Sequence, residues 1–323
     1  MCTAISYLNR QHYFGRNLDL DYSYHESVTI TPRKFPLVFR TKQGMNNHFA
    51  LIGMATVVDQ YPLYYDATNE SGLSMAGLNF PGNAVYLPPK EGSNNIAPYE
   101  FIPWVLCQCR NIAETRNLLQ NTNLTDLSFR EDFPTTPLHW IVSDRDASIV
   151  IEPLAEGIRV YDNPVGVLTN NPPFEYHMYN LINYLNLTRE VPENRFASQI
   201  DLTTYSNGMG AIGLPGDLSS ASRFVRAAFT KLNSVAEEDE NSSVSQFFHI
   251  LGTVAQQRGC VKVNGNYEKT VYTSCCNTDT GVYYYSTYEN NRITGVNLFH
   301  ENLDASDLRS FPLALKQEIR MEN

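Results

Sequence analysis

The sequence lacks a surplus of basic residues, long apolar runs and the spacings typical of metal sites. It carries 24 Lys and Arg against 34 Asp and Glu, so its net charge of -10 disfavours nucleic acid as a partner. No stretch approaches the ~20 apolar residues of a membrane span, so we expect no membrane partner either. Residues 1–20 have neither the basic start nor the apolar core of a signal peptide. We therefore expect a cytoplasmic protein.

Metal and phosphate-binding motifs are also missing. None of the 6 cysteines shows Cys-x-x-Cys spacing and the 7 histidines form no His-Glu-x-x-His pattern, so we expect reduced thiols and no metal. Gly208–Gly213 matches Gly-x-Gly-x-x-Gly, but Leu214-Pro215 stands where a phosphate-binding helix should begin, which indicates a loop. The run Tyr283-Tyr284-Tyr285 is more typical of strand packing than of base stacking.

The composition is that of an ordinary globular protein, with 42% hydrophobic and 18% charged residues in 323. One large domain or two small ones would fit this length. Because we find no repeat and no low-complexity linker, we expect one domain over residues 1–323. Predicted strands come in consecutive runs with helices in blocks, which favours an α+β fold of antiparallel sheets covered by helices.

The N-terminal segment predicts a hairpin. Residues 2–8 and 12–18 alternate as strands do, and a turn centred on Arg10 would place Cys2 opposite Leu18 and Ala4 opposite Arg16. Strand parity would then put Cys2, Arg16 and Leu18 on one face. Further strands are expected at 49–58, 72–79, 138–143, 147–152, 157–162, 258–264, 269–275, 282–288 and 292–298. Helices are expected at 98–119, 175–186, 219–232 and 243–256.

Cys2 directly follows the initiator methionine. If Met1 is removed, one residue carries both a thiol and a free α-amine, whose intrinsic pKa values are ~8.5 and ~8. Such a residue can act as nucleophile and base together, where a protease needs a separate histidine. Position alone favours the plainer interpretation of a small buried cysteine at a strand edge.

Four separate segments carry more polar side chains than a strand or turn usually does. They are Phe14–Asp19, Gly77–Gly82, Leu168–Pro172 and Leu214–Phe224. Each has a simple explanation by itself: a surface ion pair between Arg16 and Asp19, turn asparagines, or a solvated Arg223.

Together with Cys2, these segments resemble the bile salt hydrolases, also called choloylglycine hydrolases, and more distantly the penicillin V acylases. Both belong to the N-terminal-nucleophile hydrolases. The resemblance runs over nearly the whole chain, from Met1-Cys2-Thr3 to Tyr285–Asn291. It implies an αββα sandwich of two stacked antiparallel sheets with helices on both outer faces. It also implies a homotetramer and no cofactor.

The resemblance assigns roles to six polar positions. It implies that Met1 is removed and that the Cys2 thiol attacks the substrate amide, with its own α-amine moving the proton. Asp19 would orient the nucleophile, while Arg16 and Arg223 would flank the thiol. Asn79 and Asn170 would donate hydrogen bonds to the tetrahedral oxyanion. Asn171 is the nearest alternative to Asn170.

The substrate that the resemblance implies is a bile salt conjugated to glycine or taurine. Asn79 favours this class, because the penicillin V acylases commonly carry tyrosine there. Leu18, Tyr24, Phe129 and Phe133 would line an apolar wall for the steroid, although core packing explains such aromatics equally well. A penicillin V acylase and a non-catalytic binder of amphipathic anions that keeps Met1 are the alternatives.

Overall fold

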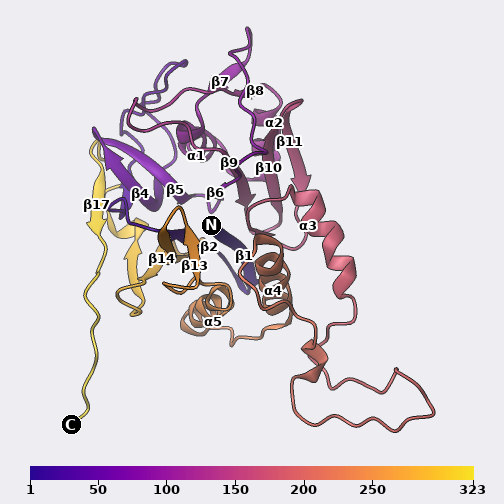
Figure 1. Ribbon diagram of the computed structural model, residues 1–323. Helices are drawn as coiled ribbons and strands as arrows, with labels where there is room; N and C mark the ends of the chain where they lie inside the picture. Colours follow the sequence, from indigo (N-terminus) through magenta and orange to yellow (C-terminus); the bar gives the residue numbers. More distant parts are fainter.

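Two antiparallel sheets packed face to face form the centre of the computed structural model, which describes residues 1–323 (Figure 1). The first sheet contains β1 (Cys2–Asn9), β2 (Gln11–Leu20), β12 (Val167–Leu168), β13 (Val261–Val263), β14 (Asn266–Asn277), β15 (Val282–Thr287) and β16 (Thr294–Asn297). Its strand order is β12-β1-β2-β14-β15-β16, and β13 pairs with β14.

The second sheet has the order β11-β10-β9-β6-β5-β4-β3-β17. Its strands are β3 (Ser27–Thr31), β4 (Leu51–Val58), β5 (Tyr61–Asn69), β6 (Ser74–Asn79), β9 (Leu138–Ser143), β10 (Ser148–Leu154), β11 (Gly157–Asp162) and β17 (Arg309–Pro312). A separate parallel pair joins β7 (Asn94–Ile96) to β8 (Thr122–Leu124).

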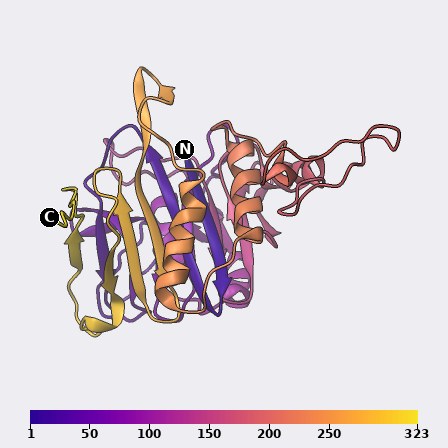
Figure 2. The same ribbon diagram turned by 90° about the horizontal axis from the view of Figure 1, so that it is seen from below.

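Helices cover both outer faces of the stacked sheets. They are α1 (Phe101–Leu106), α2 (Ile112–Leu119), α3 (Phe174–Asn180), α4 (Ser220–Asn233) and α5 (Glu240–Gly252). Helices α4 and α5 contact β1 of the first sheet and lie across that sheet in Figure 2, whereas α1 contacts β5 and β6 of the second. The αββα sandwich and the α+β class expected from the resemblance are thereby confirmed.

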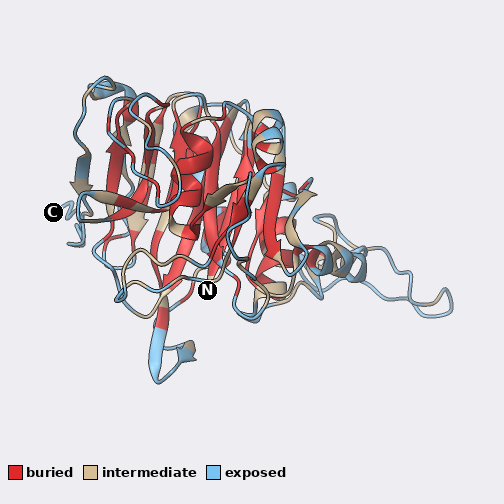
Figure 3. Ribbon diagram, turned by 90° about the horizontal axis from the view of Figure 1, so that it is seen from above, coloured by how far each residue is buried: buried red, intermediate tan, exposed pale blue.

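Alternation along the strands explains why the second sheet is covered on both sides. Ile52 and Met54 of β4 face the core shared with the first sheet, while Leu51 and Ala55 face the core under α1. Since successive side chains of a strand point to opposite faces, a run of apolar residues such as this one fits a sheet buried on both sides. Figure 3 shows the buried residues concentrated in the sheets and the exposed ones in the long loop and the C-terminal tail.

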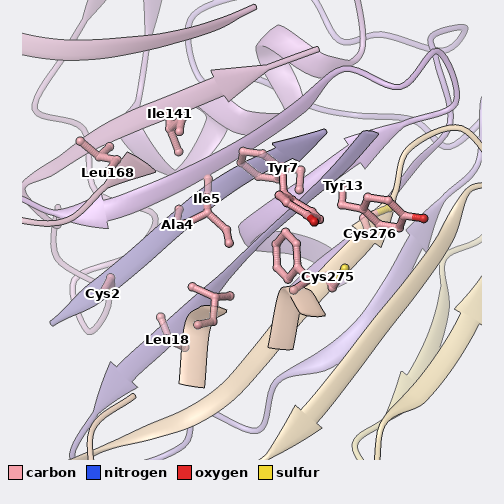
Figure 4. Packing of buried hydrophobic residues seen from close by; sticks show 14 of the residues in the cluster. Cys2, Ala4, Ile5, Tyr7, Tyr13, Leu18, Ile141, Leu168, Cys275 and Cys276 are labelled. Carbon is pink, nitrogen blue, oxygen red and sulfur yellow. The ribbon is translucent and has the colours of Figure 1, made fainter. Parts of the chain in front are cut away.

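The predicted N-terminal hairpin is confirmed in its register. Cys2 pairs with Leu18 and Ala4 with Arg16, and Arg10 alone makes the turn with a φ of 56°. Figure 4 shows Cys2 and Leu18 near one end of the paired strands. At Gly15, β2 runs so close to β14 that an added Cβ would lie 2.0 Å from the Ser274 carbonyl oxygen. A glycine is therefore required where the two strands meet.

Several expected elements differ from the structure. The single helix expected at 98–119 is wrong, because α1 ends at Leu106 and α2 begins only at Ile112, with Asn111 as its N-cap. Strands β3, β5, β7, β8, β12 and β17 were not predicted: β5 contains Pro62 and Asp66, and the other five have at most five residues each. Gly208–Gly213 contains the short 3-10 helix Met209–Ala211 instead of a plain loop, and the α-helix that follows begins only at Ser220. The packing of the Tyr283 run in β15 is confirmed.

None of the helices has the length and apolar composition needed to cross a membrane. No cluster of three or more His, Cys, Asp or Glu side chains is arranged to hold a metal ion.

Candidate active site

A cavity of about 600 Å³ opens between the ends of the two sheets. Cys2, Arg16 and Leu18 line it from β1 and β2, and Asn79 lines it from the end of β6. The wider wall is largely hydrophobic. The structure therefore brings residues from both sheets together around the Cys2 thiol, as hairpin parity predicted for the first three.

Cys2 begins β1 and is only 4% exposed. Its backbone N–H donates to Oδ1 of Asn170 at 2.8 Å. Asn170 follows β12, the strand beside β1, and its own Nδ2 donates to the Asn79 backbone carbonyl at 2.7 Å. The Asn170 side chain thus connects the N-terminal strand of the first sheet to β6 of the second.

Arg223 of α4 is fully buried and is not the solvated residue of the simple interpretation. Its guanidinium donates to the Cys2 carbonyl, to Thr3 Oγ1 at 2.7 Å and to Asn170 Oδ1 at 2.8 Å. Burial lowers the pKa of Arg223 below its ordinary value, and the electrostatic interactions with Asp19 and Cys2 act against this shift. Arg223 therefore fixes the main chain of Cys2 and the side chain of Asn170 together.

Arg16 is fully buried as well, so a surface ion pair with Asp19 is excluded. Its Nη1 donates to the backbone carbonyls of Tyr65, at 2.9 Å, and of Gly77, while its Nη2 is buried without a partner. Burial opposes the charge on Arg16, yet its electrostatic interactions with Cys2, Tyr272 and Asp66 hold its pKa above the ordinary value. An unpartnered buried donor in the cavity wall is free to bind an acceptor on a ligand.

Asp19 lies next to the start of the chain. Its backbone pairs with Met1 in both directions, at 2.8 and 2.9 Å, and its Oδ1 accepts from Thr270 Oγ1 at 2.7 Å. Its Oδ2 is buried and has no donor. Burial raises the pKa of Asp19, against the charge of Arg223. No hydrogen bond joins the Asp19 carboxylate to Cys2 while Met1 is present.

Glu268 of β14 is a site residue that the sequence did not indicate. Its Oε1 lies 3.1 Å from the Met1 ammonium, and its Oε2 is buried without a partner. Glu268 reaches the start of the chain because β14 pairs with β2, a strand far away in the sequence. No local motif around residue 268 signals this long-range contact.

The proposed apolar wall residues Leu18, Tyr24, Phe129 and Phe133 all line the cavity. The loop that carries Phe129 and Phe133 is held at both sides. Arg40 donates to the Phe129 carbonyl, and Arg130 forms ion pairs with Asp59 at 2.7 Å and Asp132 at 2.9 Å. Lining residues that the sequence analysis missed include Tyr65, Ile102, Leu127 and Trp140.

Asn79 and Asn171 differ in their surroundings. Asn79 is exposed at the cavity and its side chain makes no hydrogen bond, so its amide is available to a ligand. Neither Asn170 nor Asn171 lines the cavity itself, but Asn170 Oδ1 accepts from Cys2, whereas Asn171 Nδ2 donates to the Pro81 carbonyl at 2.6 Å. This geometry favours Asn170 over Asn171 as the partner of Cys2.

Comparison with known proteins gives matches over almost the whole chain. Residues 2–311 match the family described as linear amide C–N hydrolases, choloylglycine hydrolase family. The chain is 55% identical over 314 residues to a bile salt hydrolase/transferase of Lactiplantibacillus plantarum, covering 97% of each chain. A crystal structure of a mutant (C2A) conjugated bile acid hydrolase from Clostridium perfringens superposes with a TM-score of 0.92 at 38% identity, covering 100% of both chains.

A penicillin V acylase from Agrobacterium tumefaciens has a TM-score of 0.75 at 16% identity, over 98% of this chain and 94% of the acylase, and so shares the fold alone. The long matches at high identity show the family as well as the fold. The chain belongs to the choloylglycine hydrolase family of linear amide C–N hydrolases.

Proposed function

We propose that this enzyme hydrolyses the amide bond between a steroid acid and glycine or taurine, with Cys2 as the nucleophile after removal of Met1. The observation that carries the proposal is the position of Cys2, which begins a strand at the wall of a largely apolar cavity beside Arg16 and Asn79. The high identity to a bile salt hydrolase/transferase supports a conjugated bile salt as the substrate.

Removal of Met1 converts the Cys2 amide nitrogen into an α-amine. That nitrogen already lies 2.8 Å from Asn170 Oδ1, so its direction is set before processing. Asp19 Oδ2, buried and without a donor beside the Met1 backbone, is an acceptor for the new ammonium. These contacts support a role for Asp19 in orienting the nucleophilic residue.

The reaction proceeds by two acyl transfers. The Cys2 thiol gives its proton to the α-amine, and the sulfur attacks the amide carbonyl to form a tetrahedral oxyanion. The oxyanion collapses to a thioester, the C–N bond breaks, and the leaving amine takes up the proton. Water, deprotonated by the same α-amine, then hydrolyses the thioester and releases the steroid acid.

Asn79 and Asn170 would donate their side-chain amides to the oxyanion. The free amide of Asn79 in the cavity lining supports its role. Asn170 lies directly behind that lining, where one N–H of its amide binds the Asn79 carbonyl and leaves the second for the oxyanion. Donors that meet charge only as it develops contribute about 3 kcal/mol each to the transition state. Arg16 and Arg223 supply the positive field beside the sulfur, as their close electrostatic coupling to Cys2 supports.

Leu18, Tyr24, Phe129 and Phe133 would hold the apolar steroid. A cavity of about 600 Å³ falls within the range expected for a ligand of this size.

A penicillin V acylase is the less favoured function, because that match is at 16% identity against 55% for the bile salt hydrolase/transferase. No step of the proposed reaction requires a metal or organic cofactor.

We also propose that the chain is one domain, cytoplasmic and homotetrameric. Strands from both ends of the chain pair with each other, as β17 does with β3, which supports one domain. Buried thiols such as Cys107 and Cys275 suit a reducing compartment. The loop between α3 and α4 extends away from the sheets in Figure 2 and exposes Phe196 and Tyr205, which supports contacts with other subunits.

The test is the release of free glycine and taurine from a panel of conjugated bile salts, with penicillin V included. We expect release from the bile salts by the wild-type protein and loss of nearly all turnover in Cys2→Ser, because a hydroxyl is a far weaker nucleophile. Substantial turnover by Cys2→Ser would remove Cys2 from the nucleophile role. Faster cleavage of penicillin V than of every bile salt would favour the acylase.

A further inference from the structure

Three titratable side chains lie behind the site, buried and outside the cavity lining. His139 of β9, Glu152 of β10 and His177 of α3 are all 0% exposed. None of them lines the cavity, so none can contact the substrate there. Their position in the core raises the question of what the polar groups do.

The two histidines bind the backbone at consecutive residues of the loop after β12. His139 Nε2 lies 2.9 Å from the Thr169 carbonyl, and His177 Nε2 lies 2.9 Å from the Asn170 carbonyl. A carbonyl only accepts, so each Nε2 carries a hydrogen and donates. The main chain of Asn170 is thus held from behind, while its side chain faces Cys2.

Each ring also stacks on the residue that follows a site residue. His139 is nearly parallel to Phe80, with ring centres 4.2 Å apart, and Phe80 follows Asn79. His177 stacks on Phe224 at 4.8 Å, and Phe224 follows Arg223. The pair of rings therefore contacts the chain beside both asparagines and beside Arg223, which binds Asn170.

Glu152 binds His139 and the first residue of α3, the helix that carries His177. Its Oε1 lies 3.2 Å from His139 Nδ1 and accepts from the Phe174 N–H, at 2.9 Å, where α3 begins. Its Oε2 and His177 Nδ1 are both buried without a partner. Unpartnered buried polar atoms cost free energy, and apolar side chains would fill the same space without that cost. Packing alone therefore does not explain this cluster.

We propose that His139, Glu152 and His177 are positioning residues that fix Asn170 in the geometry that binds the oxyanion. This role rests on the function proposed above. A displacement of about 1 Å at a catalytic group is enough to slow a reaction by about 100-fold. The cluster thus acts on the transition state through Asn170 and leaves substrate binding in the apolar part of the cavity unchanged.

The test compares His177→Leu, which loses the donor, with His177→Gln, whose amide keeps it. For His177→Leu we expect kcat to fall by about 10- to 100-fold while KM changes by less than about threefold. His177→Gln should recover to within about fivefold of the wild-type kcat, because the hydrogen bond to the Asn170 carbonyl is restored. Alkylation of Cys2 by iodoacetamide should slow by less than about threefold in both variants, because Arg223 and the pairing with β2 still hold Cys2.

His12 offers a matched control, since it is buried and hydrogen-bonded to Ser6 and Thr278 away from the site. His12→Gln should lower stability and leave kcat unchanged. If His177→Leu does not fold, Glu152→Gln, which conserves volume and removes the charge, should show the same loss in kcat at constant KM.

An unchanged kcat in these variants would overturn the proposal, as would equal losses in His177→Leu and His177→Gln, since rescue by the donor is the prediction. A fall in the alkylation rate as large as the fall in kcat would also contradict it, because the defect would then lie at Cys2. If the wild-type enzyme itself releases no glycine or taurine, the proposed function fails instead.

Discussion

At the scale of single residues, Asn170 contacts three other proposed catalytic residues, Cys2, Arg223 and Asn79. Its Oδ1 accepts from the Cys2 N–H and from Arg223, its Nδ2 donates to the Asn79 carbonyl, and its backbone N–H donates to Ser220 Oγ at 2.8 Å. One side chain thus fixes the nucleophilic residue, the buried arginine and the second proposed oxyanion donor. A residue with so many fixed partners is preorganised to stabilise developing charge.

Asn170→Ala should reduce kcat by about 100-fold and raise KM much less, because an oxyanion donor acts only in the transition state. Steady-state kinetics on a conjugated bile salt would measure both constants. Asn171→Ala is the matched control, since Asn171 binds only the Pro81 carbonyl and should stay near wild type. An effect of Asn170→Ala on KM alone would remove Asn170 from the oxyanion role.

At the scale of elements, the loop that carries Phe129 and Phe133 forms one wall of the cavity. Arg130 lies 5.0 Å from the centre of the Phe133 ring and binds Asp59 next to the β4–β5 turn. These ion pairs are partly exposed, so they hold the loop weakly and are screened by salt. The apolar wall is therefore the adjustable part of a site whose polar part is rigid.

Phe133→Ala should raise KM for conjugated bile salts by about 10-fold or more with little change in kcat, since burying an aromatic side chain contributes about 1.5–3 kcal/mol. Phe299→Ala is a suitable control, because Phe299 is half exposed beside Gly281, at the opposite end of the first sheet from Cys2. A loss of kcat without a change in KM would show that Phe133 acts in chemistry instead of binding.

The elements also differ in how far the sequence alone predicts them. Parity in a tight hairpin fixed the partners of Cys2 and Ala4, because only two adjacent strands were involved. The break between α1 and α2 was not predicted, since apolar periodicity continues across residues that leave the helix at Cys107. Glu268 and His139 were missed because pairing between distant strands, which no local pattern encodes, brings them to the site.

At the scale of the whole molecule, buried histidines make stability depend on pH. Burial is the main cause that lowers the pKa of His12 and of His177 from the ordinary 6.5 to about 4. Around His12, Asp279 and Asp144 oppose the shift, and Arg145 and Lys231 add to it. As the pH falls, the unfolded chain binds these protons before the folded chain does. The stability that neutral His12 and His177 contribute is therefore complete above about pH 6.5 and is lost as the pH falls toward 4.

For His12, the shift from 6.5 to about 4 corresponds to at most about 3 kcal/mol. The urea midpoint of the wild-type protein should therefore approach that of His12→Gln as the pH falls from about 7 to about 4.5, because only the wild type loses this term. The comparison cancels the buried acids Asp19 and Asp66, whose raised pKa values act in the opposite direction. A constant difference between the two midpoints would contradict a neutral buried His12.

The central claim is that Cys2 supplies both the sulfur that takes up the acyl group and the α-amine that moves the protons in acylation and deacylation. Intact and peptide mass spectrometry of active enzyme, quenched in acid during turnover of a conjugated bile salt, tests it most directly. We predict a chain without Met1 that carries the steroid acyl group as a thioester on Cys2. An active enzyme that retains Met1, or that carries the acyl group on another residue, would contradict the account.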